Sequence, residues 1–539
     1  METPGCAGMI SVRLFCFVLQ GLLLFGFHHV QSGNVLIIPG EFSHWYHMRV
    51  IVEELVERKH SVTVLVSSSS TTVKYAEEKG FRFQFFSVPM EEHDIMVMWY
   101  NFIDAYVQYP NSSTLENASR MWKIMGTLKD YHSTLCESML RNETVLDALR
   151  QSKFDLVLID PYTPCGDLLA DTLNVPFIVV MKLFFGYSLE RICGQMPSTP
   201  SYIPTQPVNF SDKMNFQERV QNFLQYIIHT LTFLAQMNIY MKPFYSDVKG
   251  EPTVPCDVFG KAEIWLIRSS WDWDYPRPFP PNFVYIGGYH CKPAKPLPKE
   301  MEEFVQSSGN DGIVVFSLGS IFKNLTLEKR NTFASALGQI PQKVLWALSG
   351  EKPETLAPNT RIYDWIPQND LLGHPKTKAF ISHGGSNGIF EAIYHGVPIV
   401  GIPLFGDQSE NILFMKFKGA AIMLDLFKME AKDLVEALHT VTNDPLYKKN
   451  MMRISELHHD QPTKPLDRAL FWIEFVMRNK GAKHLRVQAH NLTWYQYYCL
   501  DVAVFLLAVV GLFIFIMVKT CCFYIRKCCW RTRRKNKKE

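Results

Sequence analysis

The stretch Trp365–Gln408 combines an aromatic side chain, a glycine-rich helix start, and a carboxylate beside an amide. Within it, the segment 383–388 (His-Gly-Gly-Ser-Asn-Gly) follows a short apolar run and precedes a helical pattern over 389–394. Its glycines let a ligand approach the backbone closely. A helix start offers unpaired N–H groups and a partial positive charge, which favour an anion. The pattern indicates a phosphate-binding loop, with His383 placed to donate a hydrogen bond to the same phosphate.

Side chains on either side of this loop suit a nucleoside and a sugar. Trp365 is suited to stack on a base, and Gln368 to bond the nucleoside. Glu391 is suited to accept from two ribose hydroxyls. Asp407 and Gln408 end a strand pattern, where doubly wound sheets bind ligands, and an acid beside an amide can hold vicinal hydroxyls. The alternatives are core packing for Trp365 and a helix-start charge for Glu391.

This spacing as a whole resembles the signature of the UDP-glycosyltransferases, and most closely the vertebrate UDP-glucuronosyltransferases of the family 2 type. The matching residues are Trp365, Gln368, His383, Asn387, Gly388, Glu391, Asp407 and Gln408. The resemblance extends over nearly the whole chain, including Phe316–Ser320 and the segment 290–301. It is weakest over residues 85–130 and 195–250.

The resemblance implies an α/β fold with two Rossmann-like domains facing a cleft, the GT-B glycosyltransferase fold. It also implies transfer of glucuronic acid from UDP-glucuronate to small lipophilic acceptors, with inversion and with no metal or other cofactor. Gln408 favours glucuronate, because the related ceramide galactosyltransferase type has His there. Arg268 matches a position proposed to meet the uronate carboxylate, and its alternative role is an interdomain salt bridge. Ser317, Gly319 and Ser320 join the loop at 383–388 as candidates to stabilise the leaving diphosphate.

A base is needed to take the proton of the acceptor. His44 follows the first predicted strand and Asp160 ends a later one, so both belong at the carboxyl edge of one sheet. The family resemblance assigns the same roles, with His44 as the base and Asp160 as the carboxylate that orients it. His47, one helical turn further on, is the nearest rival.

A second signal competes with this interpretation. Asp272-Trp-Asp274 is a D-x-D pattern, the metal–diphosphate motif of the other glycosyltransferase class. The pattern is short and common by chance, and the proline-rich run 275–281 that follows reads as a surface crossing. We therefore expect no metal site here.

The elements that position these residues form two series of alternating strands and helices, which predict parallel sheets. Strand patterns in the first half lie at 34–39, 61–66, 154–159, 176–180 and 263–267. Those in the second half lie at 312–317, 343–347, 379–382 and 398–402. The nicotinamide fingerprint G-x-G-x-x-G is missing after the first strand.

We therefore expect an acceptor-binding domain over 33–286, a linker over 287–300 and a UDP-sugar-binding domain over 301–460. The resemblance implies that a return segment, 461–500, packs on the first domain. An apolar, aromatic run over 220–240 is either a core helix or a contact with the membrane surface, and we favour the membrane contact.

Both ends of the chain carry targeting patterns. Residues 1–32 read as a secretory signal peptide. Residues 501–520 read as a single-pass transmembrane helix, followed by the basic tail 521–539. The segment Lys519–Glu539 carries a charge of +8 against a total of +3, so the rest carries −5. That balance argues against a nucleic-acid partner.

This order predicts a type I protein with its catalytic part in a lumen. Lys535 and Lys537 resemble the dilysine retrieval signal of endoplasmic-reticulum membrane proteins. Six sequons fall in the lumenal part, at Asn111, Asn117, Asn142, Asn209, Asn324 and Asn491. Pairing of the lumenal cysteines cannot be read from the sequence.

The acceptor also stays open, as does association with further copies or other family members. Two alternative functions remain: a transferase using another UDP-hexose, and a non-catalytic partner of an active family member.

Overall fold

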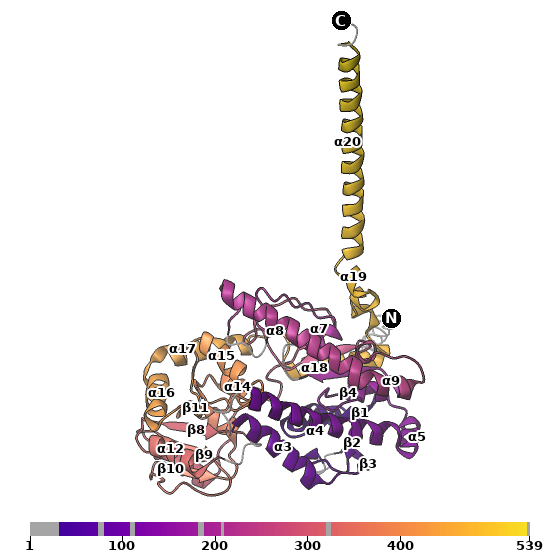
Figure 1. Cartoon of the computed structure of the whole chain (residues 1–539). Helices are drawn as coiled ribbons and strands as arrows, with labels where there is room; N and C mark the ends of the chain where they lie inside the picture. The colour runs from indigo at the N-terminus through magenta and orange to yellow at the C-terminus, as the bar shows by residue number, and fades with distance from the viewer. Residues whose placement is uncertain are drawn as a thin grey trace, which may run out of the picture. The chain divides into compact units, whose positions relative to one another are not determined.

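The computed structural model describes residues 32–73, 80–107, 114–181, 188–205, 210–319 and 325–535. By its contacts the chain divides into two units, Met1–Leu485 and Arg486–Glu539. Both sheets of the molecule belong to the first unit (Figure 1). The predicted signal peptide, apart from Ser32, lies outside the described residues.

The first sheet has seven parallel strands in the order β3-β2-β1-β4-β5-β6-β7. The chain leaves β1 in one direction to form β2 and β3, and later returns to the other side of β1 with β4, which makes β1/β4 the switch point. The strands are β1 (Asn34–Ile38), β2 (Ser61–Ser67), β3 (Arg82–Phe86), β4 (Leu156–Ile159), β5 (Phe177–Met181), β6 (Ile264–Ile267) and β7 (Phe283–Tyr285).

The second sheet repeats this plan with six parallel strands in the order β10-β9-β8-β11-β12-β13. Its switch point lies between β8 and β11. The strands are β8 (Ile313–Ser317), β9 (Lys343–Ala347), β10 (Thr360–Tyr363), β11 (Thr377–Ser382), β12 (Ile399–Gly401) and β13 (Ala421–Met423). The two sheets confirm the two Rossmann-like halves that the sequence predicts.

Helices cover both faces of each sheet because the strands are apolar on both faces. In β1, for example, Leu36 and Ile38 enter one buried cluster, and Val35 and Ile37 enter another. The helices of the first half are α2 (Ser43–Glu57), α3 (Glu92–Val107), α4 (Thr114–Leu140), α5 (Glu143–Ser152), α6 (Gly166–Leu173), α7 (Ser188–Ile192), α8 (Phe216–Ala235), the π-helix η3 (Gln236–Met241), α9 (Lys242–Lys249) and α10 (Pro255–Phe259). Those that follow are α11 (Lys299–Gln306), α12 (Leu327–Leu337), α13 (Gln368–Leu372), α14 (Ser386–His395), α15 (Gln408–Phe417), α16 (Ala431–Asn443), α17 (Pro445–His459) and α18 (Pro465–Asn479).

One buried cluster runs through both halves, and aromatic rings connect them. Trp273 lies 5.0 Å from Phe390 and 5.6 Å from Phe414, and Tyr275 lies 4.7 Å from Phe414, between ring centroids. Trp273 is fully buried. This shared core explains why the two sheets form one contact unit.

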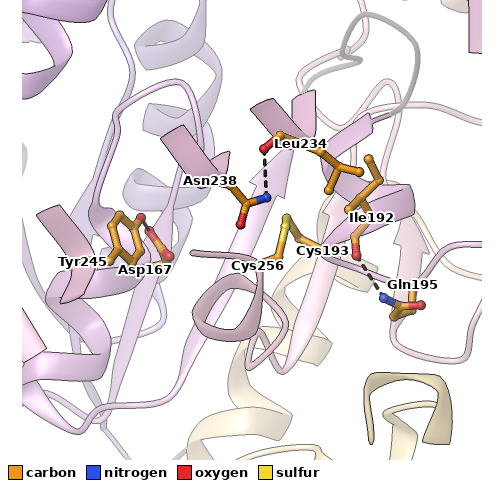
Figure 2. The surroundings of a disulfide bond; sticks show 8 residues. All are labelled: Asp167, Ile192, Cys193, Gln195, Leu234, Asn238, Tyr245 and Cys256. Atoms are coloured by element: carbon orange, nitrogen blue, oxygen red, sulfur yellow. Dashed lines mark hydrogen bonds between the residues drawn. A yellow bond between two sulfur atoms is a disulfide. The ribbon is translucent and has the colours of Figure 1, made fainter. Parts of the chain in front are cut away.

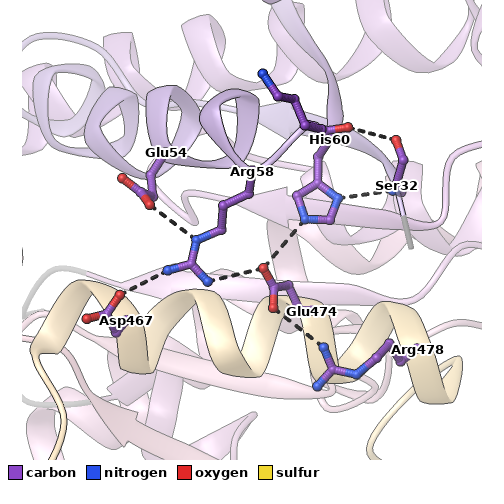
Figure 3. Close-up of polar contacts among 9 residues, drawn as sticks. Ser32, Glu54, Arg58, His60, Asp467, Glu474 and Arg478 are labelled. Carbon is purple, nitrogen blue, oxygen red and sulfur yellow. Dashed lines mark hydrogen bonds and ion pairs between the residues drawn. The ribbon is translucent and has the colours of Figure 1, made fainter. Parts of the chain in front are cut away.

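Helix α18 packs on the first sheet, although it follows the second in sequence. Leu470, Ile473 and Val476 join the same buried cluster as the residues of α2 and β1. A polar seam borders this contact (Figure 3): Arg58 donates to Asp467 at 2.9 Å and to Glu474 at 3.3 Å. The first unit ends at Leu485, so residues 461–485 of the expected return segment belong to it.

Two disulfides, Cys136–Cys165 and Cys193–Cys256, brace the helices of the first half. The second joins the end of α7 to α10 (Figure 2). Near it, Tyr245 of α9 donates to Asp167 of α6 at 2.8 Å. Burial raises the pKa of Asp167 to about 7, which favours the neutral carboxyl at this bond.

The second unit contains a 3₁₀-helical turn, a short α-helix and one long helix. These are η5 (Gln488–Asn491), α19 (Trp494–Tyr497) and α20 (Leu500–Lys535). Leu500–Trp530 is long and apolar enough to cross a membrane. Exposed aromatic residues precede it and basic residues close it, as at the two ends of a membrane anchor.

Candidate functional site

The structure brings His44 and Asp160 together at the switch point of the first sheet. His44 lies in the first turn of α2, after β1, and Asp160 directly follows β4. Their Nδ1 and Oδ2 atoms are 2.7 Å apart, and the side chains are 15% and 4% exposed. An ionised carboxylate can accept hydrogen bonds but cannot donate them. This contact therefore places a proton on Nδ1 of His44 and leaves Nε2 as the basic nitrogen.

Neighbouring residues that the sequence did not single out hold this pair in place. A Cβ atom on Gly40 would lie 2.8 Å from the Cβ of His44 and 3.1 Å from Oδ2 of Asp160, so only glycine fits there. The backbone N–H of Tyr162 donates to the other carboxylate oxygen, Oδ1, at 2.9 Å. The ring of Tyr162 lies 4.8 Å from His44 and stacks on Trp99. The His44 imidazole, whose Nε2 is not the atom bonded to Asp160, therefore lies beside aromatic rings.

The loops at the second switch point present backbone rather than side chains. Gly319, after β8, and Gly384, after β11, have φ angles of +84° and +86°. The His383 ring lies between Gly319 and Gly385, where added Cβ atoms would approach it to 2.8 and 2.5 Å. Ser317 accepts from the N–H of Gly319 at 3.2 Å. The predicted Ser320 lies outside the described residues.

The predicted nucleoside residues lie beside these loops. Gln368 begins α13 and donates to Glu391 of α14 at 2.6 Å. Gly388 packs against them, since an added Cβ would lie 3.3 Å from the Gln368 amide nitrogen. Burial raises the pKa of Glu391 to about 7. Trp365 is 75% exposed, which rules out core packing and leaves its ring face open.

The Asp407–Gln408 pair lies at the start of α15, after β12. The Oε1 atom of Gln408 accepts from the backbone N–H groups of Leu404 and Phe405, at 2.9 and 3.1 Å. The side chain therefore fixes its own loop, and its amide Nε2 is the group that can donate to a ligand. Asp407 accepts from Asn411 at 3.0 Å, and Asn411 also donates to the Gly384 carbonyl at 2.8 Å. These bonds connect the acid–amide pair to the glycine loop.

Arg268 contacts the opposite half of the molecule. This buried residue follows β6 and donates to the Asn387 side chain, in the first turn of α14, at 2.8 Å. His290, which follows β7, lies 3.3 Å from the Asn387 backbone oxygen, and its ring is 4.1 Å from that of His47. Burial lowers the pKa of His290 to about 3, so it bonds as a neutral ring. His47 belongs to this interdomain contact, whereas the Asp160 partner is His44.

Both carboxylates of the D-x-D pattern contact polar side chains of the protein itself. Asp274 is buried and accepts from Arg277 at 2.6 Å and from Tyr285 at 2.8 Å. Asp272 lies 3.0 Å from His458. The pattern braces the contact between the two halves.

The described residues include three of the six sequons. Asn142 caps α5 by accepting from the Val145 N–H, and Asn491 is exposed in η5. Asn117 lies on α4. Asn111, Asn209 and Asn324 lie outside the described residues.

Two parallel doubly wound sheets with loops at both switch points define the GT-B class of glycosyltransferases. Solved structures support this assignment. The chain is similar to Phytolacca americana UGT2, solved with UDP-2-fluoro-glucose and pterostilbene, with a TM-score of 0.55 and 15% identity, over 83% of this chain and 100% of that one. It is also similar to the calicheamicin glycosyltransferase CalG4, with a TM-score of 0.52 and 17% identity, over 82% and 98%.

Sequence comparison then gives the family. The family model described as "UDP-glucoronosyl and UDP-glucosyl transferase" matches residues 33–535, and the chain belongs to this family of glycosyltransferases. UDP-glucuronosyltransferase 2B17 of Homo sapiens is 50% identical over the full length of both chains. UDP-glucuronosyltransferase 2A3 of Cavia porcellus is 51% identical, over 96% of this chain and 97% of that one.

Proposed function

We propose that this glycosyltransferase moves glucuronic acid from UDP-glucuronate to a hydroxyl group of small lipophilic acceptors, and that His44 is the base. The observation that carries the proposal is the 2.7 Å contact between His44 Nδ1 and Asp160 Oδ2 at the switch point of the first sheet. A histidine oriented by a carboxylate is suited to accept a proton through its other nitrogen.

The reaction balances without a further co-reactant. His44 Nε2 takes the proton of the acceptor hydroxyl while the acceptor oxygen attacks the anomeric carbon of the donor. The bond from that carbon to the diphosphate breaks, UDP leaves with the electron pair, and the anomeric configuration inverts. Asp160 then stabilises the imidazolium, since its carboxylate faces the protonated Nδ1. The rings of Phe42, Trp99 and Tyr162 offer a lipophilic acceptor an apolar surface beside the base.

In this proposal the second sheet holds the donor. Trp365 stacks on the uracil, Gln368 and Glu391 bond the nucleoside, and Asp407 with Gln408 bonds the sugar. The diphosphate lies against the loops after β8 and β11 and the start of α14. Its leaving charge is stabilised by donors that are already oriented, from the backbone and from Ser317, His383, Asn387, Gly319 and Gly388. We expect a chelator to leave turnover unchanged for this reason.

Glucuronate as the transferred sugar is supported by the relatives, which are about half identical and are named UDP-glucuronosyltransferases. Arg268 supplies a matching charge. Its guanidinium is buried at the contact between the halves and bonds the neutral side chain of Asn387. We infer that the uronate carboxylate engages this guanidinium, because an ionised acceptor gives the stronger hydrogen bond.

We further propose that the catalytic part lies in the lumen of the endoplasmic reticulum and that α20 is a type I anchor. The apolar span Leu500–Trp530, with basic residues toward its end, supports the anchor. The two disulfides support an oxidising compartment for the first unit.

The test is donor consumption by microsomes that express the full chain, with UDP-glucuronate, UDP-glucose, UDP-galactose and UDP-N-acetylglucosamine compared against one panel of phenols and steroids. We expect turnover with UDP-glucuronate at least about tenfold above any other donor, since a bidentate charged pair contributes a few kcal/mol. Preference for another UDP-hexose would refute the donor assignment. UDP binding without turnover of any donor would indicate a non-catalytic family member.

A further inference from the structure

Helix α20 carries four cysteines near its basic end. They are Cys521, Cys522, Cys528 and Cys529, and all four are exposed. Residues seven positions apart on an α-helix are rotated by about 700°, which is about 20° less than two full turns. Cys528 therefore lies almost directly beyond Cys521 along the helix, and Cys529 lies beyond Cys522. The four thiols share one side of the helix, which we call the cysteine face.

The opposite side of this segment has a different composition. Phe523 and Lys527 are one helical turn apart there, and the Lys527 amine lies over the Phe523 ring, 5.8 Å from its centroid. This contact holds the ammonium group on the side away from the cysteine face, so the charge does not cover the thiols.

The cysteine face lies where the apolar part of α20 meets its basic part. The uncharged run 502–518 has 17 residues, or about 26 Å of helix, against a hydrocarbon core about 30 Å thick. With α20 as the anchor, completing the span requires about three more residues, which places Cys521 and Cys522 at the boundary with the headgroups. Cys528 and Cys529 lie about 10 Å further along the helix, outside the hydrocarbon.

Two common uses of clustered thiols do not fit this arrangement. Cα atoms six to eight residues apart on a helix are separated by at least about 9 Å, whereas a disulfide needs less than about 7 Å. Neighbouring cysteines project about 100° apart, which also prevents a bridge without unwinding the helix. In the part of the chain that the structure describes, no group of three or more His, Cys, Asp or Glu side chains could hold a metal ion.

We propose that the cysteine face is a site of S-acylation, at which long-chain fatty acyl groups are joined to the thiols as thioesters. The proposal rests on α20 being a type I anchor, which places these cysteines on the cytosolic side. A cysteine thiolate attacks the carbonyl carbon of a fatty acyl–coenzyme A, and the bond from that carbon to the coenzyme A sulfur breaks. Coenzyme A leaves with the electron pair and takes up the proton that the cysteine released, so no oxidant or reductant is needed.

The surroundings of the cysteine face suit both parts of this acyl donor. Coenzyme A carries several phosphate charges. Arg526 and Lys527 lie between the two cysteine pairs in the sequence, and the tail 530–539 adds six further Lys or Arg residues, which attract such an anion. The fatty chain of the product enters the hydrocarbon next to Cys521 and Cys522, where burial of each methylene group is favourable. Acylation of both pairs would hold residues 521–529 at the membrane surface and let the basic tail project from it.

The first experiment counts thioesters on the full chain. Microsomes from cells that express the protein are treated with N-ethylmaleimide to block thiols, and then with neutral hydroxylamine to cleave thioesters. A maleimide–polyethylene glycol then adds mass to each released thiol. We expect a hydroxylamine-dependent ladder of heavier bands for the natural chain and none for Cys521→Ser/Cys522→Ser/Cys528→Ser/Cys529→Ser. Absence of the ladder from the natural chain, or its persistence in the fourfold variant, would overturn the proposal.

Two double variants and a matched control locate the acylated residues. Cys521→Ser with Cys522→Ser, and Cys528→Ser with Cys529→Ser, should each remove part of the ladder. A double variant that leaves the ladder unchanged would overturn the assignment of that pair. Cys499→Ser replaces an exposed cysteine just before the other end of α20, and it should leave the ladder unchanged. Heavy species that dithiothreitol removes, in place of the ladder, would identify disulfides to another chain and contradict S-acylation.

A protease-protection assay on the same microsomes separates this proposal from the anchor on which it rests. The protein carries an epitope tag after Glu539, and protease is added to intact vesicles. Digestion of the tag, with the first unit protected, is the result expected of a type I anchor. Digestion of the tag without any thioester ladder would overturn S-acylation alone. Protection of the tag would refute the type I orientation and, with it, the cytosolic position of the cysteine face.

Discussion

The two sheets follow the same strand order, yet their switch points carry different chemistry. At β1/β4 the functional atoms belong to side chains: an imidazole, a carboxylate and aromatic rings. At β8/β11 the proposed functional atoms belong largely to the backbone of loops that contain Gly319 and Gly384, both with positive φ angles. One topology thus provides two switch points, and in the proposed function the loop residues suit the first to accept a proton and the second to hold an anion.

Because of this difference, we expect mutations at the two switch points to change different quantities. Changes at the first switch point should affect the chemical step, because in the proposed mechanism the imidazole acts on the developing transition state. Changes at the second should affect donor binding, because the glycine loops shape the site for the diphosphate. Arg268 and Asn387 connect the two halves, so the separation is tested by measuring turnover and donor affinity on the same variants.

The largest effect is expected from His44→Ala. Removing the base should lower turnover of a phenol by about a thousandfold, the usual scale for a general base, and leave the Kd for UDP within about twofold. Asp160→Asn should also lower turnover strongly, because an amide can hold the imidazole in the wrong tautomer. Turnover is measured in microsomes, and UDP affinity by ligand-induced thermal shift.

His93→Ala, which alters an exposed histidine on α3, is the matched control and should change neither quantity. Near-normal turnover of His44→Ala would remove this residue from the mechanism. A loss of UDP affinity as large as the loss of turnover would show that the two switch points do not act separately.

A smaller effect, on donor affinity rather than on turnover, is expected from Gly319→Ala. The alanine would have to adopt a left-handed backbone conformation, at φ +84°. Its methyl group would lie 2.8 Å from the His383 ring. We expect the Kd for UDP to rise about tenfold, equivalent to about 1.4 kcal/mol, while turnover at saturating donor falls less.

Gly309→Ala is the control for backbone strain. Gly309 also has a positive φ angle, +59°, but its added Cβ would meet no atom within 4 Å. Both variants should lose similar thermal stability, and only Gly319→Ala should lose donor affinity. Equal UDP affinity in the two variants would mean that the position of His383 does not matter for the donor.

The sequence predicted the centre of each sheet better than its edges. Its nine predicted strands are present, and the four that it missed, β3, β7, β10 and β13, are the four edge strands. The patterns of β3 (RFQFF) and β10 (TRIY) include polar or partly exposed positions, because an edge strand is less fully covered. The central strands are apolar on both faces, and that composition is visible without the fold.

The same reasoning explains which parts of the candidate site were predictable. Most of the candidate donor residues lie in one continuous motif from Trp365 to Gln408, so local spacing identifies them. His44 and Asp160 are 116 residues apart, and only the strand order shows that β1 and β4 are neighbours. The role of Gly40, which makes room for that contact, depends on a distance between loops and leaves no trace in spacing.

Three further features required the structure for the same reason. The two disulfides depend on helix packing, and the bond between Arg268 and Asn387 depends on how the halves meet. The periodicity of α8 indicates a helix with an apolar stripe, but not that Phe223, Leu224 and Leu231 of this stripe are exposed. Proximity in the fold, rather than residue type, decides all three.

The smallest expected effect is a pH dependence of donor binding that arises from Glu391, a side chain at the second switch point. Burial raises its pKa to about 7, above the usual 4.5, so the folded protein holds this proton more tightly than the unfolded chain. Its contribution to the stability of the free protein therefore falls as pH rises from about 4.5 to 7. Donor binding should have the opposite dependence, because only the carboxylate accepts from both ribose hydroxyls.

We therefore expect the KM for the UDP-sugar to rise by up to about tenfold as pH falls from 8 to 6, because ionisation of a group with this pKa changes by that factor. The diphosphate of a UDP-sugar stays ionised over this range and adds no pH dependence of its own. Glu391→Gln should remove the dependence, and Glu456→Gln, which removes an exposed charge from the same half, should retain it. A KM that changes with pH equally in all three proteins would assign the titration to another group and remove Glu391 from ribose binding.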